Sequence, residues 1–372
     1  MNSKLIQMAT STIINEEEEE YYCQYAMQLA SASVLPMALK AATDLGVLEI
    51  IEKAGPSAQL SSSQIASQLA SPAAQTAPHV LDRILLVLAS NGILTCSATA
   101  TIGTEDGQLS RFFGLAPVAK YFIKNHDRGC LAPFLAVIHD KVIMDTWHHL
   151  KDAVVEGGNT FEKAHGMSFM EFKGKDSSFV EMFKDSMRDF NTLLMRRILD
   201  KYDGFQGLMS LVDVGGGDGS ILNMIISKYP SIKGINYDLA PVIEKSPSYA
   251  GIQHVAGDMF MNVPKGEAIF VKWVLHMWDD EHCLKLLKNC YEALPSDGKL
   301  IAVDMVVPEA IGDNVAAKGL LQTHLLFTNM NPKRNDRTER EFQTLGKKAG
   351  FSHVGVAACA FNFSVVEFLK LI

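Results

Sequence analysis

A glycine-rich loop near the middle of the chain follows a short apolar run. Residues 211–219 read Leu-Val-Asp-Val-Gly-Gly-Gly-Asp-Gly, which places glycines at 215, 217 and 219. Glycine lets the backbone turn tightly and approach a ligand closely. The spacing departs from the dinucleotide-binding fingerprint, because Ser220 stands where that fingerprint has a third glycine or alanine. By itself the loop indicates a binding site only moderately, since many glycine-rich turns bind nothing.

Two acidic residues and a lysine follow the next predicted strands. Asp238 comes at the end of the predicted strand 234–237. Asp258 follows the next strand along the chain, and Lys272 lies near the end of the predicted strand 268–273. In nucleoside sites, the acid that binds the ribose diol follows the glycine loop at about the sequence separation of Asp238. Asp258 could accept a hydrogen bond from an adenine amino group. A single Asp after a strand usually caps a helix, but two behind a glycine loop favour a nucleoside site. No Walker lysine follows the loop, so we expect a nucleoside without a triphosphate.

His276 stands in an apolar run, residues 274–278, and has two interpretations. A lone histidine in such a run is more often a core residue with satisfied hydrogen bonds. Its position just beyond a strand, where α/β proteins bind ligands, instead favours a general base. His282 and Cys283 follow at a spacing that suits neither a zinc site nor a metalloprotease helix, so we assign them to helix surface and core.

The elements that would position these residues alternate between strand and helix after residue 207. Such alternation is typical of βαβ units and a parallel sheet, with ligands at the carboxyl ends of the strands. The predicted strands are 209–214, 234–237, 268–273 and 299–307, with helices at 281–294 and 338–349; 354–358 and 362–368 could close the sheet.

The region before residue 123 predicts a winged helix. Apolar residues repeat at helical spacing over 35–51, a capping box spans 61–64, and a longer helix opens at Pro78. Two short strands, 93–95 and 112–115, then form a hairpin. A DNA-binding role needs several cations on the third helix and the wing, but only Arg83 and Arg111 are present there, so a structural or dimerising role is favoured.

A helical region from about 131 to 202 is rich in methionine and aromatic residues. Phe179, Phe183, Met187 and Phe190 are three or four residues apart and share one helix face. This face could be core, or it could line a pocket for a planar apolar ligand, and the sequence favours neither.

Composition limits the partners. The 372 residues include 34 Lys plus Arg and 42 Asp plus Glu, a formal charge of −8, which disfavours nucleic acid and anionic membranes. Six scattered cysteines without a C-x-x-C pair are typical of reduced thiols and predict a cytoplasmic protein. Residues 1–20 predict an acidic tail with no signal peptide, in which the five glutamates of residues 16–20 are a solvated tail or the frayed start of a helix. No segment approaches the ~18 apolar residues of a membrane span.

Several motifs occur in one order along the chain. They are Val212–Gly217, Tyr237–Pro241, Gly257–Phe260 and Val271–Glu281, with Leu150–Val154 and Glu156–Gly158 before them. Together they resemble the plant small-molecule O-methyltransferases of the caffeic acid type, from Tyr22 to the C-terminus. The resemblance implies an α/β Rossmann-like methyltransferase domain with an N-terminal, mostly helical winged-helix dimerisation domain. It also implies a homodimer in which each partner lines part of the other acceptor pocket.

The implied organisation has four parts. Residues 1–20 form the tail, 21–122 the dimerisation domain, 123–202 a helical connecting and acceptor-pocket region, and 203–372 the S-adenosylmethionine-binding domain. The resemblance assigns cofactor binding to Gly215, Asp238, Asp258, Met259 and Lys272. S-adenosyl-L-methionine is the expected cofactor and S-adenosyl-L-homocysteine its product, with no metal.

By the same resemblance, His276 is the general base and two acidic residues, Asp304 and Asp336, flank it. Relatives of the caffeic acid type usually have glutamate at both acidic positions. The implied acceptor pocket consists of Val137, Ile138, Phe169, Phe179, Phe183, Met187, Phe190, Leu326, Phe327 and Asn331.

Departures from the family pattern indicate the acceptor. Relatives that act on caffeic acid tend to have Asn at position 138 and His at positions 173 and 190, where this chain has Ile138, Lys173 and Phe190. A greasier pocket favours a hydroxycoumarin, furanocoumarin or flavonoid over a free hydroxycinnamic acid. The alternatives are a caffeic acid or 5-hydroxyferulic acid 3-O-methyltransferase, an N-methyltransferase, and a non-catalytic winged-helix binding protein. Metal-dependent catechol methyltransferases are disfavoured, because they are much shorter and lack the N-terminal domain.

Overall fold

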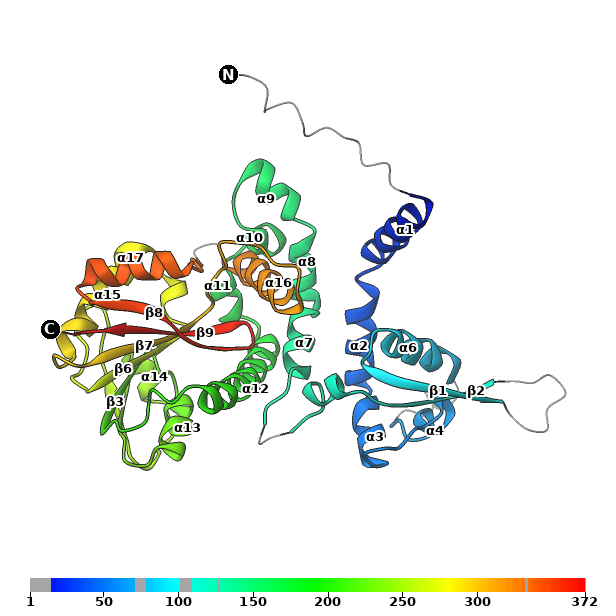
Figure 1. The fold of residues 1–372 in the computed structure, drawn as a ribbon, viewed down its shortest axis with the longest axis horizontal. Coiled ribbons are helices and arrows are strands. Elements are labelled where there is room, and N and C mark those ends of the chain that lie inside the picture. The colour runs from blue at the N-terminus through cyan, green and yellow to red at the C-terminus, as the bar shows by residue number, and fades with distance from the viewer. Residues whose placement is uncertain (1–14, 71–77, 101–108, 126–127, 332–333, 372) are drawn as a thin grey trace, which may run out of the picture. The chain divides into compact units, whose positions relative to one another are not determined.

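The computed structural model describes residues 15–70, 78–100, 109–125, 128–331 and 334–371. The chain forms two compact units, residues 1–123 and 124–372 (Figure 1). Residues 124–202, expected as a connecting region, belong to the same unit as the sheet that follows them.

The N-terminal unit begins with a helix where a tail was predicted. Helix α1 spans Glu16–Ala30, and four of the five glutamates occupy its first turn. Asn15 caps this helix by accepting from the backbone N–H of Glu18, whose side chain accepts in return from Asn15. Acidic residues in a first turn interact favourably with the helix dipole, so of the two expectations for this run, a solvated tail or a helix start, the structure shows the helix start. The predicted tail's remaining residues, 1–14, lie outside the described part of the chain.

The rest of this unit has the predicted order of helix, capped helix, longer helix and hairpin. Its elements are α2 (Val34–Asp44), α3 (Val47–Lys53), α4 (Ser62–Ala66), α6 (Pro78–Ser90), β1 (Leu94–Ala100), β2 (Leu109–Leu115) and η1 (Pro117–Tyr121). The two strands pair antiparallel, with Leu94 opposite Leu115. The predicted capping box is present, because Ser61 accepts from the backbone of Gln64 and Gln64 accepts from that of Ser61. The turn signals at Gly103, Asp106 and Gly107 lie outside the described residues.

The second unit is built on a seven-stranded sheet with the order β5-β4-β3-β6-β7-β9-β8. The first five strands in this order are parallel, and β9 and β8 are antiparallel (Figure 1). The strands are β3 (Ser210–Val214), β4 (Lys233–Asp238), β5 (Ile252–Ala256), β6 (Ala268–Lys272), β7 (Lys299–Asp304), β8 (His353–Ala360) and β9 (Phe363–Leu369). The carboxyl ends of β3, β4, β6 and β7 therefore meet at one edge, as the sequence predicts.

Helices cover both faces of this sheet and divide its core. Alternate residues of β6 enter opposite clusters: Ile269 and Val271 on one face, and Ala268 and Phe270 on the other. Helices α15 (Asp280–Ala293) and α17 (Glu339–Ala349) bury apolar residues on the first face, and α12 (Ser177–Lys201) and α13 (Ser220–Lys228) on the second. Burial on both faces explains the continuous apolar runs that predict these strands.

A separate aromatic cluster in the same unit is formed by short helices around α16 (Val315–Met330). Its contributors are α7 (Ala132–Ile138), α8 (Lys141–Trp147), α10 (Thr160–His165), α11 (Phe169–Lys173), α12 and α16. Phe161, at its centre, is fully buried. Helix α9 (Leu150–Glu156) follows α8 in the chain, and α14 (Ala240–Ile243) contacts β4 and β5 of the sheet.

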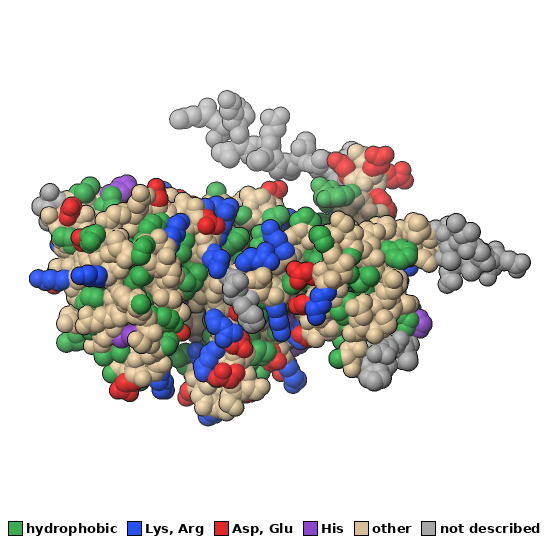
Figure 2. Space-filling model, turned by 90° about the horizontal axis from the view of Figure 1, so that it is seen from below, with side chains coloured by type: hydrophobic (Ala, Val, Ile, Leu, Met, Phe, Trp, Pro, Cys, Tyr) green, Lys and Arg blue, Asp and Glu red, His purple; other side chains and the backbone are tan. Residues whose placement is uncertain are grey.

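Helix lengths and surface charge are the features that concern the expected absence of membrane and nucleic-acid partners. No helix among the described residues is both long and apolar enough to cross a membrane. On the face seen in Figure 2, basic and acidic described side chains lie beside each other.

Candidate active site

The glycine loop follows β3 and is held by the acid that ends β4. Gly215 has φ 71°, and a Cβ there would lie 2.9 Å from Val274 Cγ2, so no other residue fits without strain. The backbone N–H of Gly217 donates to Asp238 Oδ2 at 2.9 Å, and that of Leu239 donates to Asp238 Oδ1 at 2.7 Å. Asp238 therefore fixes the shape of the loop as well as facing the space in front of it.

A cavity of about 410 Å³ lies in front of this loop. The structure brings together at it four of the predicted cofactor-binding residues: Gly215, Asp238, Asp258 and Met259. Its walls are otherwise mainly apolar and aromatic, with Leu239, Phe260, Trp273, Val274, Met277 and Trp278 among them. The cavity thus combines two carboxylates with flat apolar walls, which suits a nucleoside.

Lys272, the fifth predicted cofactor-binding residue, is not among the residues that line this cavity. Its ammonium donates to the side-chain oxygen of Asn191 on α12 and lies 3.2 Å from the ring centroid of Trp273. Burial lowers the pKa of Lys272 to about 7, although Asp213 and Asp304 act in the opposite direction. Burial likewise raises the pKa of Asp213 to about 7. The hydrogen bond from Lys272 to Asn191 therefore connects the end of β6 to α12.

Trp273 lines the cavity in an unusual backbone conformation. Its φ of 58° lies in the left-handed region, which costs a bulky residue of order 1–3 kcal/mol and persists only where surrounding structure imposes it. Its indole N–H is buried without a hydrogen-bond partner in the described protein.

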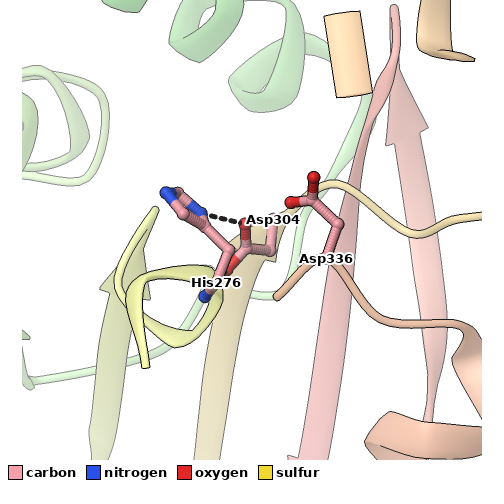
Figure 3. Close-up of side chains that lie close together, drawn as sticks. All are labelled: His276, Asp304 and Asp336. Atoms are coloured by element: carbon pink, nitrogen blue, oxygen red, sulfur yellow. Dashed lines mark hydrogen bonds and ion pairs between the residues drawn. The ribbon is translucent and has the colours of Figure 1, made fainter. Parts of the chain in front are cut away.

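His276 lies in a short 3-10 turn, η2 (Leu275–Met277), directly after β6. Its Nδ1 is 2.6 Å from Asp304 Oδ1, and its backbone N–H donates to Asp304 Oδ2 at 3.3 Å (Figure 3). The two side chains are only 11% and 2% exposed. With Asp304 ionised, Nδ1 carries the proton and Nε2 keeps its lone pair, the form that a general base requires.

The charge of Asp304 depends on two neighbouring side chains. Burial of this carboxyl raises its pKa, but the imidazole of His276 and the guanidinium of Arg334 together outweigh that effect. The pKa of Asp304 therefore lies below its ordinary value, and the carboxylate is anionic at neutral pH.

Asp336, the second predicted acidic neighbour, lies close to this pair but makes no hydrogen bond to His276 in the structure. One ligand atom from each of His276, Asp304 and Asp336 lies within 4.8 Å of the other two. The carboxylate of Asp336, which lies beside the His276–Asp304 pair in Figure 3, is instead paired with Arg334, 2.6 Å from Nη2, and with His324 Nδ1 at 2.7 Å. Arg334 Nε also donates to Asp336 Oδ2, at 2.7 Å.

The same cluster has the residue types of a metal site. Its donor set does not fit one, because the Arg334 guanidinium already neutralises Asp336 and would repel a cation at this position. The arrangement therefore favours acid–base chemistry.

Arg337 is a positioning residue that the sequence did not indicate. It is fully buried, and its guanidinium donates to the backbone oxygens of Leu275 and Trp278 at 2.8 and 2.9 Å. It also donates to Asp280 Oδ1 at 2.8 Å. These bonds hold both ends of the turn that presents His276. An isolated arginine before a helix carries no sequence signal for this role.

The predicted acceptor residues divide between neighbouring environments. Val137, Ile138, Phe169, Phe179, Phe183, Leu326 and Phe327 belong to the aromatic cluster around α16. Phe183 and Met187 line a second cavity, of about 970 Å³, together with Gly217 of the glycine loop. Phe190 packs on Trp273 with ring centroids 5.6 Å apart, and Asn331 ends α16. The helix face shared by Phe179, Phe183 and Met187 is thus part core and part cavity wall.

Comparisons with known proteins agree with this geometry. A family model described as an O-methyltransferase domain matches residues 147–352, and one described as an O-methyltransferase dimerisation domain matches residues 27–125. The chain is 50% identical over 357 residues to a caffeic acid 3-O-methyltransferase of Ammi majus, covering 96% of each chain. It is also 50% identical over 359 residues to an esculetin O-methyltransferase of Kitagawia praeruptora, covering 96% of this chain and 98% of the relative.

A solved structure shows the same fold. Human N-acetylserotonin methyltransferase, in complex with S-adenosylmethionine, superposes with a TM-score of 0.75 at 19% identity. The match covers 96% of this chain and 100% of that one. The predicted fold class, an N-terminal dimerisation domain followed by a Rossmann-like domain, is confirmed.

The Arg337 contacts predict a loss of both stability and turnover on truncation. Arg337→Met leaves the carbonyl oxygens of Leu275 and Trp278 without their donor, so the free energy of unfolding should fall by about 2–4 kcal/mol. Urea unfolding and turnover of a phenolic acceptor measure the two effects. The matched control is Arg340→Met, at an arginine that is 79% exposed, where a change below about 0.5 kcal/mol is expected. Equal effects at both positions would contradict the role of Arg337.

The two acidic residues should differ in their effect on turnover. Asp304→Asn removes the charge bonded to His276 and should lower kcat by about 100-fold or more. Asp336→Asn changes a carboxylate that does not contact the imidazole and should cost no more than roughly tenfold. Steady-state kinetics on both variants, with melting temperatures to confirm folding, measure the difference. An Asp336→Asn variant as impaired as Asp304→Asn would show that both acids act on His276.

Proposed function

The chain belongs to the family of S-adenosylmethionine-dependent O-methyltransferases, and on this premise we propose that it methylates a phenolic hydroxyl of a plant phenylpropanoid-derived small molecule, with His276 as the general base. The observation that supports this role most directly is the 2.6 Å contact between His276 Nδ1 and buried Asp304. It places an oriented imidazole in the same turn as Met277, which lines the cavity in front of the glycine loop.

The residues around that cavity fit the cofactor. S-adenosylmethionine supplies an electrophilic methyl group on a positively charged sulfur. Asp238 and Asp258 would accept from its hydroxyl and amino groups, Gly215 allows close approach of the backbone, and Phe260 and Trp278 offer flat faces for the adenine. Lys272 would affect cofactor binding indirectly, by holding two neighbouring side chains. Its ammonium donates to Asn191 and lies over the ring of Trp273.

The imidazole faces a proton transfer that is unfavourable in water. A phenol with a pKa of about 10 and an imidazole with one of about 6.5 differ by roughly 3.5 units, or about 5 kcal/mol for complete transfer. The Asp304 carboxylate, bonded to Nδ1, interacts favourably with the positive charge that the imidazole gains during the transfer. Holding the hydroxyl close to the methyl donor lowers the barrier further.

We propose a hydroxycoumarin, furanocoumarin or flavonoid as the preferred acceptor. Ile138 packs in the aromatic cluster and Phe190 packs on Trp273, so both positions are apolar where relatives acting on caffeic acid tend to have polar side chains. The likeness to an esculetin O-methyltransferase supports a coumarin. The equal likeness to caffeic acid 3-O-methyltransferases keeps caffeic acid or 5-hydroxyferulic acid as the second candidate.

We further propose that the enzyme is a cytoplasmic homodimer. The match to a dimerisation domain supports the assembly. Helix α1 has no buried residue in the single chain and exposes Tyr21, Tyr22 and Tyr25, which suits an apolar contact with a second copy. All six cysteines are free thiols, as is usual for proteins of the cytoplasm.

Replacement of the proposed base separates chemistry from cofactor binding. His276→Gln keeps a polar side chain but cannot accept the proton, so kcat should fall by about 100-fold or more. S-adenosylhomocysteine should still raise the melting temperature of the variant as much as that of the wild type, because the cofactor residues are unchanged. Retained turnover would remove His276 from its role. A missing thermal shift in the wild type would favour the non-catalytic alternative.

A panel of acceptors tests the proposed specificity. Esculetin and a hydroxyflavone should have a kcat/KM at least about tenfold above that of caffeic acid. Moving the carboxylate of caffeic acid from water into an apolar pocket costs free energy that the uncharged acceptors do not lose. Ile138→Asn should narrow this difference by introducing a polar group. Product identification by mass spectrometry and NMR gives the position methylated. A higher kcat/KM for caffeic acid with the wild-type enzyme would contradict the preference.

A further inference from the structure

A cavity of about 620 Å³ in the second unit gathers basic side chains, although the chain has a formal charge of −8. Its lining residues come from α12, α13, the segment before α7 and the turn between β8 and β9. Arg128, Arg196, Arg197 and Lys228 are basic, and Asp200 is the acidic residue among them. A concave surface with this excess of positive charge attracts anions.

The three arginines of this cavity have no counter-ion among the described residues, and Asp200 pairs with none of them. Every other arginine of the same unit is paired with a carboxylate. These pairs are Arg188–Asp185, Arg334–Asp336, Arg337–Asp280 and Arg340–Glu309. A guanidinium holds its N–H donors in a planar fork that matches two oxygens of a phosphate. Three such groups on one cavity therefore have donors available for a bound anion.

The backbone that carries these side chains is fixed by the core. Arg196 and Arg197 directly precede Ile198 on α12, whose side chain is buried against the sheet. Lys228, the last residue of α13, donates to the backbone oxygen of Leu199 and so joins α13 to α12. Because the two helices are held together, little backbone freedom is lost when an anion binds to their side chains.

An aromatic residue at the wall of this cavity occupies a strained turn. Strand β8 ends at Ala360 and pairs there with Phe363 of β9, so Phe361 and Asn362 form a two-residue hairpin turn. Phe361 has φ 54°, at a turn position where glycine is usual. It lines the cavity and is 49% exposed. A bulky aromatic residue kept partly exposed where glycine fits better is typical of a position that contacts a ligand.

We propose that this cavity binds a small molecule that carries phosphate groups and a flat ring, as a nucleotide does. Arg128 and the arginines of α12 would bind the phosphates, and the Phe361 ring would stack on the flat part of the ligand. Asn223 and Ser227 of α13 add an amide and a hydroxyl for further hydrogen bonds. The volume of about 620 Å³ is in the range of small-molecule sites.

This site is separate from the site of the proposed chemistry. It contains neither His276 nor any residue that lines the cavity in front of the glycine loop. A nucleotide bound here would therefore be present together with S-adenosylmethionine, not in its place.

Isothermal titration calorimetry with three probes tests charge and ring separately. ADP has both features, pyrophosphate has only the charge and adenosine only the ring. The full-length enzyme is saturated with S-adenosylhomocysteine, so that the nucleoside cavity is occupied, and no divalent metal is added. ADP should bind with a Kd below about 1 mM, pyrophosphate about fivefold or more weakly, and adenosine not measurably.

Two variants remove the two features one at a time. Arg196→Gln combined with Arg197→Gln should weaken ADP and pyrophosphate alike by about tenfold or more, because two guanidinium groups are lost. Phe361→Gly should weaken ADP by about fivefold and leave pyrophosphate within about twofold. Its melting temperature should not fall, since glycine is unstrained at φ 54°.

The matched control is Arg83→Gln, at an exposed arginine of α6 that also has no ion pair among the described residues. Both Kd values should stay unchanged in this variant. Titrations with saturating esculetin form a second control, because the cavity of about 970 Å³ shares Arg196 with this one, and ADP should still bind.

ADP binding that weakens in both variants of the cavity, but not in Arg83→Gln, supports the site. No binding of ADP at millimolar concentration, equal weakening in Arg83→Gln, equal affinities for ADP and pyrophosphate, or displacement of ADP by esculetin would overturn it. Failure of the proposed function is distinguishable, because retained turnover in His276→Gln would leave ADP binding and its dependence on Arg196 unchanged.

Discussion

The hydrogen bond between His276 Nδ1 and Asp304 Oδ1 is the interaction on which the proposed chemistry depends. It joins the turn after β6 to the carboxyl end of β7. Strands β6 and β7 are adjacent and parallel, and they are paired from Ala268 to Lys272 of β6. Because both strands are buried on both faces, their ends cannot move independently. The sheet therefore sets the tautomer of the imidazole as well as its position.

The segment after α16 contains two arginines with different roles at this site: one balances the charge of the buried carboxylates, and the other supports the turn. Arg334 supplies positive charge to Asp336 directly and to Asp304 through space. Arg337 supplies hydrogen bonds to the backbone around His276. One segment of chain thus provides both the charge balance and the mechanical support of the turn. A pair of acids this close would otherwise repel each other and take up a proton.

The proposed acceptor region differs from the sheet edge in how it is built. Short helices and α16 contribute single aromatic side chains to it, and most of these touch one another edge to face, as Phe169 does with Phe161 and Phe179. Aromatic pairs of this kind form rigid, flat surfaces. Lys173, placed over two of these rings without a counter-ion, is the polar exception in that surface.

Local patterns in the sequence were enough to locate the strands, the glycine loop and His276, because strand ends and tight turns depend on neighbouring residues. Asp238 and Asp258 could be placed at one edge for the same reason, since parallel strands bring their carboxyl ends together, whereas Asp304 was indicated only by the resemblance to the family. The run of like charges at residues 16–20 is compatible with a solvated tail or a helix start, and the capping box of Asn15 and Glu18 decides for the helix.

Only the tertiary structure decided which partner each long polar side chain takes. Asp336 pairs with Arg334 and His324 and not with His276, and Lys272 reaches Asn191 on a helix far away in the chain. The sequence contains all these groups but not the distances between them. A difference of a few ångströms in distance decides which of two groups pairs with a buried charge. The reason is that the strength of an ion pair or hydrogen bond falls steeply with separation where water is excluded.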